Sequence, residues 1–282
     1  MTEENVRGNL NALCRRLKLN YLDQQLETVL EAAKAGRYSA AETLEFALSI
    51  EVSNREARRI DIGMKVAHFE SVKRLEDYDF SLMPALDESI VRDLARLEWV
   101  CSGANVLFLG PPGVGKTHLA IALGREAVKA GYSVSFVLAS DLMDELEKAS
   151  RDNDLKRVIL KYTKPRVLII DEIGYLPIRA QTAHLFFQLV SVRYKKHLSI
   201  VMTGNRPVSE WGLVFGDPTA TSAILDRTLH HCEIVAIRGE SVRMLEKRRA
   251  GLVKAKDSAA TAEVISAAKA EARNLAEVDP EL

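Results

Sequence analysis

The sequence has few aromatic residues and no net charge. Only 6% of its 282 residues are aromatic, and 39 Lys and Arg residues are balanced by 39 Asp and Glu residues. A chain without net charge has no overall attraction to nucleic acid or acidic membranes, although local clusters can still have one. The 47% share of hydrophobic residues is typical of a globular protein and excludes disorder over most of the length.

Cysteine and long apolar runs are also scarce. The three cysteines are Cys14, Cys101 and Cys232. Their odd number and wide spacing favour a reducing compartment, and only His230 and His231 lie beside one of them, so zinc is not expected. The longest apolar runs are far shorter than a membrane span, and residues 1–17 have no apolar segment of a secretory signal. We therefore expect a cytoplasmic protein without a membrane segment.

Residues 1–75 are predicted to form a small all-α N-terminal region. Apolar residues recur there at helical spacing in three groups: Leu10, Leu13 and Leu17; Leu22, Leu26 and Leu30; and Leu44, Leu48 and Val52. Gly36 interrupts this pattern, and either Ser39 or Thr43 is placed to cap the helix that follows.

The pattern changes in the middle of the chain. A linker around Pro84 precedes a predicted helix from about Glu88 to Val100. Five short apolar runs then alternate with helix-length segments: NVLFL, SVSFVL, RVLIID, LSIVMT and CEIVAI. This alternation predicts an α/β core with a five-stranded parallel sheet, which we place at residues 76–250. Residues 251–282 are rich in alanine and charge and are expected to form a flexible or helical tail.

The segment GPPGVGKT follows the first apolar run and matches the phosphate-binding pattern GxxxxGK[ST]. Glycines let backbone N–H groups curl around phosphate oxygens, and the helix that follows adds partial positive charge. We expect Lys116 to reach the β and γ phosphates of ATP, and Thr117 to bind Mg²⁺. The predicted ATP-binding residues are Gly110, Pro111, Pro112, Gly113, Val114, Gly115, Lys116, Thr117 and His118. A glycine turn that matches by chance is the alternative, and the strand, loop and helix order disfavours it.

The run RVLIID is predicted to supply the acidic part of the site. Asp171 and Glu172 would lie at the carboxyl edge of the sheet, where α/β proteins bind their ligands. We expect Asp171 to hold Mg²⁺ through water and Glu172 to act as general base toward the attacking water. Such an acidic pair is often only a helix cap or an ion pair, but here it follows a phosphate-binding loop.

Two further residues are candidates for a role in catalysis. Asn205 ends another buried run and would orient the attacking water if its strand lies beside that of Asp171. A turn asparagine before Pro207 is equally compatible with the sequence. Arg227 lies on a predicted short helix, from which it would complete the site of a neighbouring subunit. A surface ion pair is the usual explanation for a helical arginine.

Four segments together resemble one group of ATPases: GPPGVGKTHLA, VLIIDEIGYLP, TGNRPVSEW and ILDRTLHHCEIVAIRGES. They are similar to the IstB group of insertion-sequence helper ATPases, relatives of the DnaC-type helicase loaders within the AAA+ class. The similarity extends from about Leu10 to Arg249. It implies a P-loop AAA+ core in which Asn205 is sensor 1 and Arg227 is the arginine finger.

The resemblance also concerns the wall of the nucleotide site. It implies that Tyr78 and Phe80, in the linker, lie near the adenine. Val242 occupies a position where an aromatic residue is usual, and TGN replaces the commoner TSN while leaving Asn205 in place. No lid-length helical domain follows the last predicted strand, so we assign no sensor 2 arginine.

The function that the resemblance implies is transposition. The chain would form an ATP-dependent homo-oligomer on double-stranded target DNA, hydrolyse ATP, and recruit or stimulate a DDE-type, IstA-like transposase. A replicative helicase loader of the DnaC type is an alternative, because its ATPase core would look almost the same. A monomeric P-loop kinase that phosphorylates a small molecule is a second alternative.

Local clusters of basic residues are candidates for DNA contact. Residues 146–166 hold seven basic and three acidic side chains. The candidate contacts in this segment are Arg151, Lys156, Arg157 and Lys161. Two further clusters lie at residues 238–256, with KRR at 247–249, and at Arg55, Arg58 and Arg59. A solvated helix surface is the alternative for each cluster, and without a helix-turn-helix pattern we expect contact mainly with the DNA backbone.

Overall fold

The computed structural model describes residues 3–175, 178–242 and 244, so the predicted tail and the KRR segment lie outside the described residues. Five parallel strands form one sheet in the order β2-β3-β4-β1-β5. The strands are β1 (Asn105–Leu109), β2 (Val134–Leu138), β3 (Val167–Ile173), β4 (Ser199–Gly204) and β5 (Cys232–Ala236). Each apolar run of the sequence is one of these strands, so the predicted parallel sheet is confirmed. All carboxyl ends therefore lie at one edge of the sheet.

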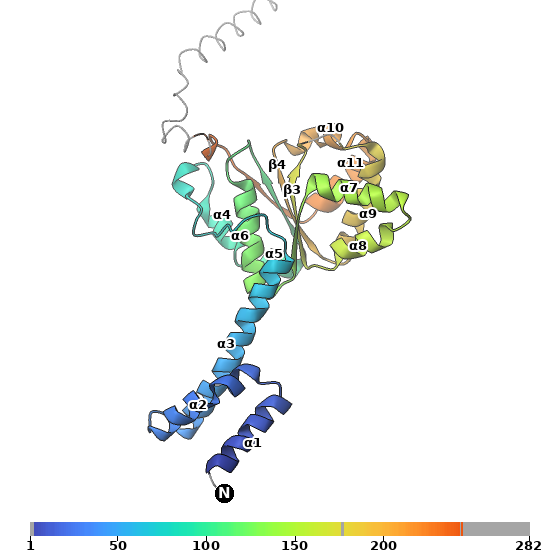
Figure 1. Cartoon of the computed structure of the whole chain (residues 1–282). Coiled ribbons are helices and arrows are strands. Elements are labelled where there is room, and N and C mark those ends of the chain that lie inside the picture. The colour runs from blue at the N-terminus through green and yellow to red at the C-terminus, as the bar shows by residue number, and fades with distance from the viewer. Residues whose placement is uncertain (1–2, 176–177, 243, 245–282) are drawn as a thin grey trace, which may run out of the picture.

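Helices cover both faces of the sheet (Figure 1). One face carries α4 (Glu88–Leu94), α5 (Glu98–Ser102) and α6 (Lys116–Lys129). The other carries α7 (Ala139–Arg151), α8 (Leu155–Thr163), α9 (Ala180–Lys195), α10 (Trp211–Phe215) and α11 (Pro218–Leu229). Successive strand residues enter opposite cores: Val106 and Phe108 join the first and Leu107 the second. Burial on both faces explains why the strands read as continuous apolar runs.

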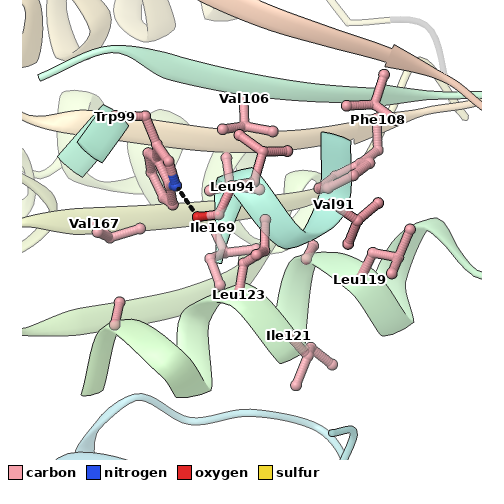
Figure 2. Packing of buried hydrophobic residues seen from close by; sticks show 14 of the residues in the cluster. Val91, Leu94, Trp99, Val106, Phe108, Leu119, Ile121, Leu123, Val167 and Ile169 are labelled. Atoms are coloured by element: carbon pink, nitrogen blue, oxygen red, sulfur yellow. Dashed lines mark hydrogen bonds between the residues drawn. The ribbon is translucent and has the colours of Figure 1, made fainter. Parts of the chain in front are cut away.

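The predicted continuous helix from about Glu88 to Val100 is wrong. The chain instead forms α4 and α5, and Leu97 between them has a left-handed backbone with φ of 65°. This turn buries Trp99, whose indole N–H donates to the carbonyl oxygen of Leu94 at 2.8 Å. Figure 2 shows this bond above α6, within the first core. The helical break therefore satisfies the one polar atom of a buried aromatic side chain.

Three helices form the N-terminal region: α1 (Glu3–Arg16), α2 (Asn20–Lys34) and α3 (Ala40–Val66). Of the two predicted caps, Ser39 is the one that starts α3. Its hydroxyl accepts the backbone N–H of Glu42, whose carboxylate in turn accepts the N–H of Ser39. Gly36 supplies the left-handed turn before it, with φ of 64°. The helices predicted from apolar spacing are thus confirmed.

Helix α3 runs from the N-terminal helices to the core without a break (Figure 1). Its last turns carry Ile60 and Met64, which pack against the first core. Just beyond it, the carbonyl oxygen of Ala67 accepts the N–H of Phe136 at 2.8 Å. Because β2 is an edge strand, this bond covers part of the open edge of the sheet. None of the described helices is long and apolar enough to cross a membrane.

A buried carboxylate, Glu51, joins α3 to α2. Its Oε2 accepts the backbone N–H groups of Tyr21 and Leu22 at 2.8 and 3.0 Å, and its Oε1 accepts Nε of Arg55 at 2.6 Å. The two N–H groups belong to the first turn of α2. Backbone N–H groups in the first turn have no carbonyl acceptor within their own helix. Burial alone would raise the pKa of Glu51, but the bonds from Leu22, Arg55 and Tyr21 outweigh it and lower that pKa.

We expect Glu51→Ala to destabilise the N-terminal helices by about 2–4 kcal/mol, because two buried backbone donors lose their acceptor. Hydrogen–deuterium exchange of α1 and α2 at pH 7 measures this, with the exposed Glu56→Ala as control. Since the folded-state pKa of Glu51 is lowered, its contribution is complete above the ordinary pKa and is lost as pH falls through the lowered value. Acidification should therefore lower the protection of α1 and α2 in wild type toward that of Glu51→Ala. Equal protection in Glu51→Ala and Glu56→Ala at pH 7 would contradict the assignment.

Candidate functional site

The segment between β1 and α6 forms the predicted glycine loop. Gly113 and Gly115 have left-handed φ values of 83° and 90°, which favour glycine. A Cβ atom on Gly115 would lie 2.5 Å from Cε2 of Tyr78, so there is also no room for a side chain. Helix α6 begins at Lys116, which places the partial positive charge of its N-terminus directly at the loop.

The ends of β1 and β3 meet at this loop. The Thr117 hydroxyl lies 3.0 and 2.9 Å from the two carboxylate oxygens of Asp171, which is buried. The Lys116 ammonium donates to the carbonyl oxygens of Gly110 and Pro111, both at 2.8 Å. A hydroxyl beside a carboxylate suits Mg²⁺, which prefers one or two carboxylates together with phosphate oxygens and water. No three His, Cys, Asp or Glu residues cluster as a metal site in the part of the chain described.

A cavity of about 640 Å³ runs along the loop, a volume within the range of small-molecule sites. Six of the predicted ATP-binding residues line it: Pro112, Gly113, Gly115, Lys116, Thr117 and His118. Gly110, Pro111 and Val114 are not among its lining residues, and the Val114 side chain is buried in the core instead. Val242 also lines the cavity, and its N–H donates to the carbonyl oxygen of Gly113 at 2.9 Å.

The linker between α3 and α4 forms another wall of the cavity. The Tyr78 hydroxyl donates to the carbonyl oxygen of Val114 at 3.0 Å, and burial raises the pKa of Tyr78 to about 12, so the phenol stays protonated at neutral pH. His118 Nε2 lies 2.7 Å from the carbonyl oxygen of Arg74. Tyr78 lines the cavity, whereas Phe80 does not and packs edge-on against Tyr78, with ring centroids 4.8 Å apart. Two side chains thus attach the linker to the loop and α6.

The acidic end of the cavity is built by β3 and β4. These strands are neighbours, with Ile173 paired to Gly204, so Asn205 lies beside the strand of Asp171 as expected. Glu172 and Asn205 both line the cavity. Glu172 has a left-handed backbone, with φ of 63°, at a shift in the pairing of the two strands. The structure therefore brings the loop, both acids and Asn205 to one place.

Several residues of the cavity were not singled out from the sequence, and two of them, Thr203 and Glu70, bear on its acidic groups. Thr203, at the end of β4, donates its hydroxyl to Asp171 Oδ1 at 2.5 Å. Its signal in the sequence was a polar residue at the end of an apolar run. Glu70 lines the cavity from the linker, where partial burial raises its pKa and the charges of Asp171, Glu172 and Asp141 raise it further. No local pattern marks Glu70, because only the folded linker brings it there.

Arg227 does not line the cavity of its own chain. It lies on α11, where its guanidinium carbon is 4.6 Å from the centroid of the Phe187 ring. Its Nη1 donates to the carbonyl oxygen of Ala223 at 3.1 Å and lies 3.9 Å from the carboxylate of Asp226. The side chain is 30% exposed, so it remains accessible to a neighbouring molecule. Its action on a second subunit stays a prediction.

Two of the four candidate DNA contacts are engaged within the chain. Arg157 and Lys161 each form an ion pair with an acidic neighbour, at N–O distances of 2.5 and 2.8 Å. Arg151 and Lys156 are exposed, and neither has an acidic side chain within 4 Å among the described residues. The unpaired positive surface of α7 and α8 is therefore smaller than the number of basic residues suggests.

The other two basic clusters differ from this one. Arg55 binds Glu51 and the carbonyl oxygen of Lys18, and Arg59 donates to that of Lys129 at 3.2 Å. Both arginines therefore make structural contacts within the chain. Most of the cluster at residues 238–256 lies outside the described residues.

Comparison with known proteins gives a consistent result. A family model described as "IstB-like ATP binding protein" matches residues 12–250. A protein of insertion sequence IS21 from Pseudomonas aeruginosa is 45% identical, over 86% of this chain and 92% of the relative. A protein of insertion sequence IS5376 from Geobacillus stearothermophilus is 38% identical, over 86% and 96%.

Solved structures resemble the chain in fold. The replication initiator DnaA, bound to AMPPCP and single-stranded DNA, has a TM-score of 0.52 at 19% identity. The match covers 67% of this chain and 59% of that one. DnaA from Aquifex aeolicus, bound to AMPPCP, gives 0.51 at 19% identity. At this identity the likeness concerns the fold alone, and it agrees with the α/β fold and five-stranded parallel sheet predicted for the core.

Proposed function

Because the chain belongs to the family of IstB-like ATP binding proteins, we propose that it is a Mg²⁺-dependent ATPase that assists DNA transposition. The observation that carries this proposal is the contact between Thr117, on the glycine loop, and the buried Asp171. A hydroxyl of the glycine loop beside a buried carboxylate is an arrangement suited to Mg²⁺ and nucleotide phosphates, and so supports the proposal. The relatives from insertion sequences support the transposition context.

Each group at the cavity has a distinct part in the proposed hydrolysis. Loop N–H groups and the Lys116 ammonium bind the phosphates, the ammonium leaving the carbonyl oxygens of Gly110 and Pro111 to do so. Thr117 and Asp171 hold Mg²⁺, which neutralises phosphate charge when bound. Glu172 accepts a proton from the attacking water, and Asn205 orients that water.

The proposed assembly is a homo-oligomer with ATP between subunits. Its support is the place of Arg227, which is outside its own cavity yet partly exposed on α11. An arginine in that position can stabilise the charge that develops in a neighbour's site. Hydrolysis would then depend on assembly, and assembly on ATP.

We propose that the oligomer binds double-stranded target DNA through the phosphate backbone. Arg151 and Lys156 are the two predicted contacts whose charges are not balanced by an ion pair in the described chain. Each subunit would bind DNA weakly. An oligomer assembled with ATP would bind it more tightly, because several subunits contact the same DNA. Binding should therefore require ATP and weaken with salt.

The double variant Arg151→Ala/Lys156→Ala is expected to weaken DNA binding about equally for all sequences. Because each of the two side chains is proposed to bind one phosphate, the slope of log K against log salt concentration should fall by about 2 per subunit. Fluorescence anisotropy with labelled duplex DNA, in ATP and at several salt concentrations, measures this slope. The control is Lys195→Ala/Lys196→Ala, which removes the same charge at the exposed end of α9. An unchanged slope in the first variant would remove α7 and α8 from the interface.

A direct test of the proposed function uses the full chain. We expect phosphate release from ATP to need Mg²⁺ and to rise with duplex DNA, and ATP to increase the sedimentation coefficient. The partner is identified by co-precipitation with a DDE-type transposase and, in parallel, with the replicative helicase. A small-molecule kinase would stay monomeric and would not respond to DNA. Capture of the helicase without the transposase would favour the loader alternative.

A further inference from the structure

We propose that Thr203 is a positioning residue that holds both acids of the site, Asp171 and Glu172, in their working arrangement. The inference rests on the proposed ATPase function and deepens it. The Thr203 hydroxyl lies 2.5 Å from Asp171 Oδ1 and 3.0 Å from the backbone nitrogen of Glu172. One side chain on β4 thus contacts both acids of β3.

The chemistry of these contacts fixes the direction of each hydrogen bond. A backbone N–H can only donate, so the hydroxyl oxygen accepts from Glu172. A hydroxyl has a single proton, and it goes to the carboxylate of Asp171. Thr203 is only 1% exposed, so water does not compete for either bond. The hydroxyl therefore donates to one acidic residue, Asp171, and accepts from the other, Glu172.

Glu172 needs this support because β3 leaves its regular pairing there. The pairing of β3 with β4 runs to Ile170 and resumes, shifted, at Ile173. A residue in such a bulge lacks a normal partner in the strand ladder. Its φ of 63° is also unfavourable for any residue but glycine. The Thr203 oxygen supplies the missing acceptor and so stabilises the turn that presents the Glu172 carboxylate to the cavity.

Asp171 is fixed from two sides. Thr117 contacts its carboxylate from the loop, at 3.0 and 2.9 Å, and Thr203 contacts it from the neighbouring strand. The Thr117 hydroxyl is also the group proposed to bind the metal, so it changes partners when nucleotide enters. Thr203 does not, and it keeps Asp171 in place through that change. It also lies two residues before Asn205, so the end of β4 orients both the acids and the attacking water.

The test compares Thr203→Val, which keeps the shape and removes the hydroxyl, with Thr203→Ser, which keeps it. We expect the valine variant to lose about 10–100-fold in kcat for ATP and the serine variant to stay within about threefold of wild type. The Kd of a fluorescent ATP analogue with Mg²⁺ should change less than about threefold in both. Thr203→Ala removes the same hydroxyl from a smaller side chain and replaces the valine variant if the latter does not fold.

Thermal unfolding and nucleotide affinity separate positioning from a merely structural role. The control is Thr163→Val, since Thr163 is also buried but donates only to the carbonyl oxygen of Leu160 in its own helix. We expect Thr203→Val to have a lower Tm than the control, because the Glu172 N–H and the Asp171 carboxylate lose a buried partner, yet to stay folded at the assay temperature. The control should keep wild-type kcat. A Thr203→Val variant whose nucleotide affinity falls in proportion to its kcat would indicate a structural role and overturn the inference.

The outcome also distinguishes this inference from the function on which it rests. If wild type hydrolyses ATP and Thr203→Val does so at the same rate, the inference is wrong and the proposed function stands. If Thr203→Ser is as impaired as Thr203→Val, the hydroxyl is not the cause and the inference is again wrong. If wild type releases no phosphate with Mg²⁺ and duplex DNA, the proposed function fails, and the inference fails with it.

Discussion

Glu172→Gln is expected to lower ATP hydrolysis by about 10²–10⁴-fold, because the amide cannot accept the proton of the attacking water. The two side chains have nearly the same size, and the Glu172 N–H that binds Thr203 is kept. ATP binding should therefore persist, and with it the ATP-bound oligomer on DNA. Phosphate release, analogue affinity and sedimentation with duplex DNA measure the three properties on one preparation.

The control for this prediction is Glu233→Gln, which removes an exposed carboxylate from the edge strand β5. It should hydrolyse ATP at the wild-type rate. Wild-type hydrolysis by Glu172→Gln would show that another group accepts the proton. Loss of nucleotide binding by the same variant would show instead that the Glu172 charge serves binding.

Arg227→Ala is expected to lower hydrolysis by about 10³-fold or more in a homogeneous oligomer, because an arginine finger carries an effect of that size. Its own cavity keeps every lining residue, since Arg227 is not one of them. Mixing Arg227→Ala with Glu172→Gln subunits should therefore restore hydrolysis. In such mixtures an intact cavity of the first variant meets an intact arginine of the second. Rates measured across mixing ratios should pass through a maximum.

Two controls separate the proposed action of the Arg227 guanidinium from a loss of packing or of charge. Arg227 lies over the Phe187 ring, so truncation also removes packing, and Tm must be compared. Arg227→Lys keeps the charge without the planar guanidinium and should remain impaired if geometry matters. Mixtures no faster than the sum of their components would argue against action between subunits.

The sequence predicted those parts of the site that depend on local pattern. The glycine loop is contiguous, and Asp171 and Glu172 follow an apolar run, so spacing and residue type sufficed to find them. The contact of Thr203 with Asp171 depends on the pairing of β3 with β4, which no local pattern encodes. The break at Leu97 likewise depends on the burial of Trp99, a tertiary effect.

In the N-terminal helices, the sequence pattern predicted the helices but not which of their faces are buried. Spacing predicted α3 through Leu44, Leu48 and Val52, yet these three are exposed in the structure. Ala47 and Ile50 on the same helix are buried against α2 instead. Periodicity identifies a helix, but two adjacent faces of one helix can both carry apolar residues, and only packing decides which is covered. The ion pairs of Arg157 and Lys161 were likewise not predictable, since they depend on the fold, and DNA contact by the four candidate residues stays a prediction.

Because α3 is one unbroken helix, it holds the N-terminal helices at a distance from the core. Its 27 residues span about 40 Å at 1.5 Å each. The segment that follows it contains Tyr78 and Arg74, which contact the loop and α6 at the nucleotide cavity. A tilt of about 5° at the base of such a rod displaces its tip by about 3.5 Å. A small change of angle at the linker would therefore displace α1 and α2 much further than it displaces the residues at the cavity.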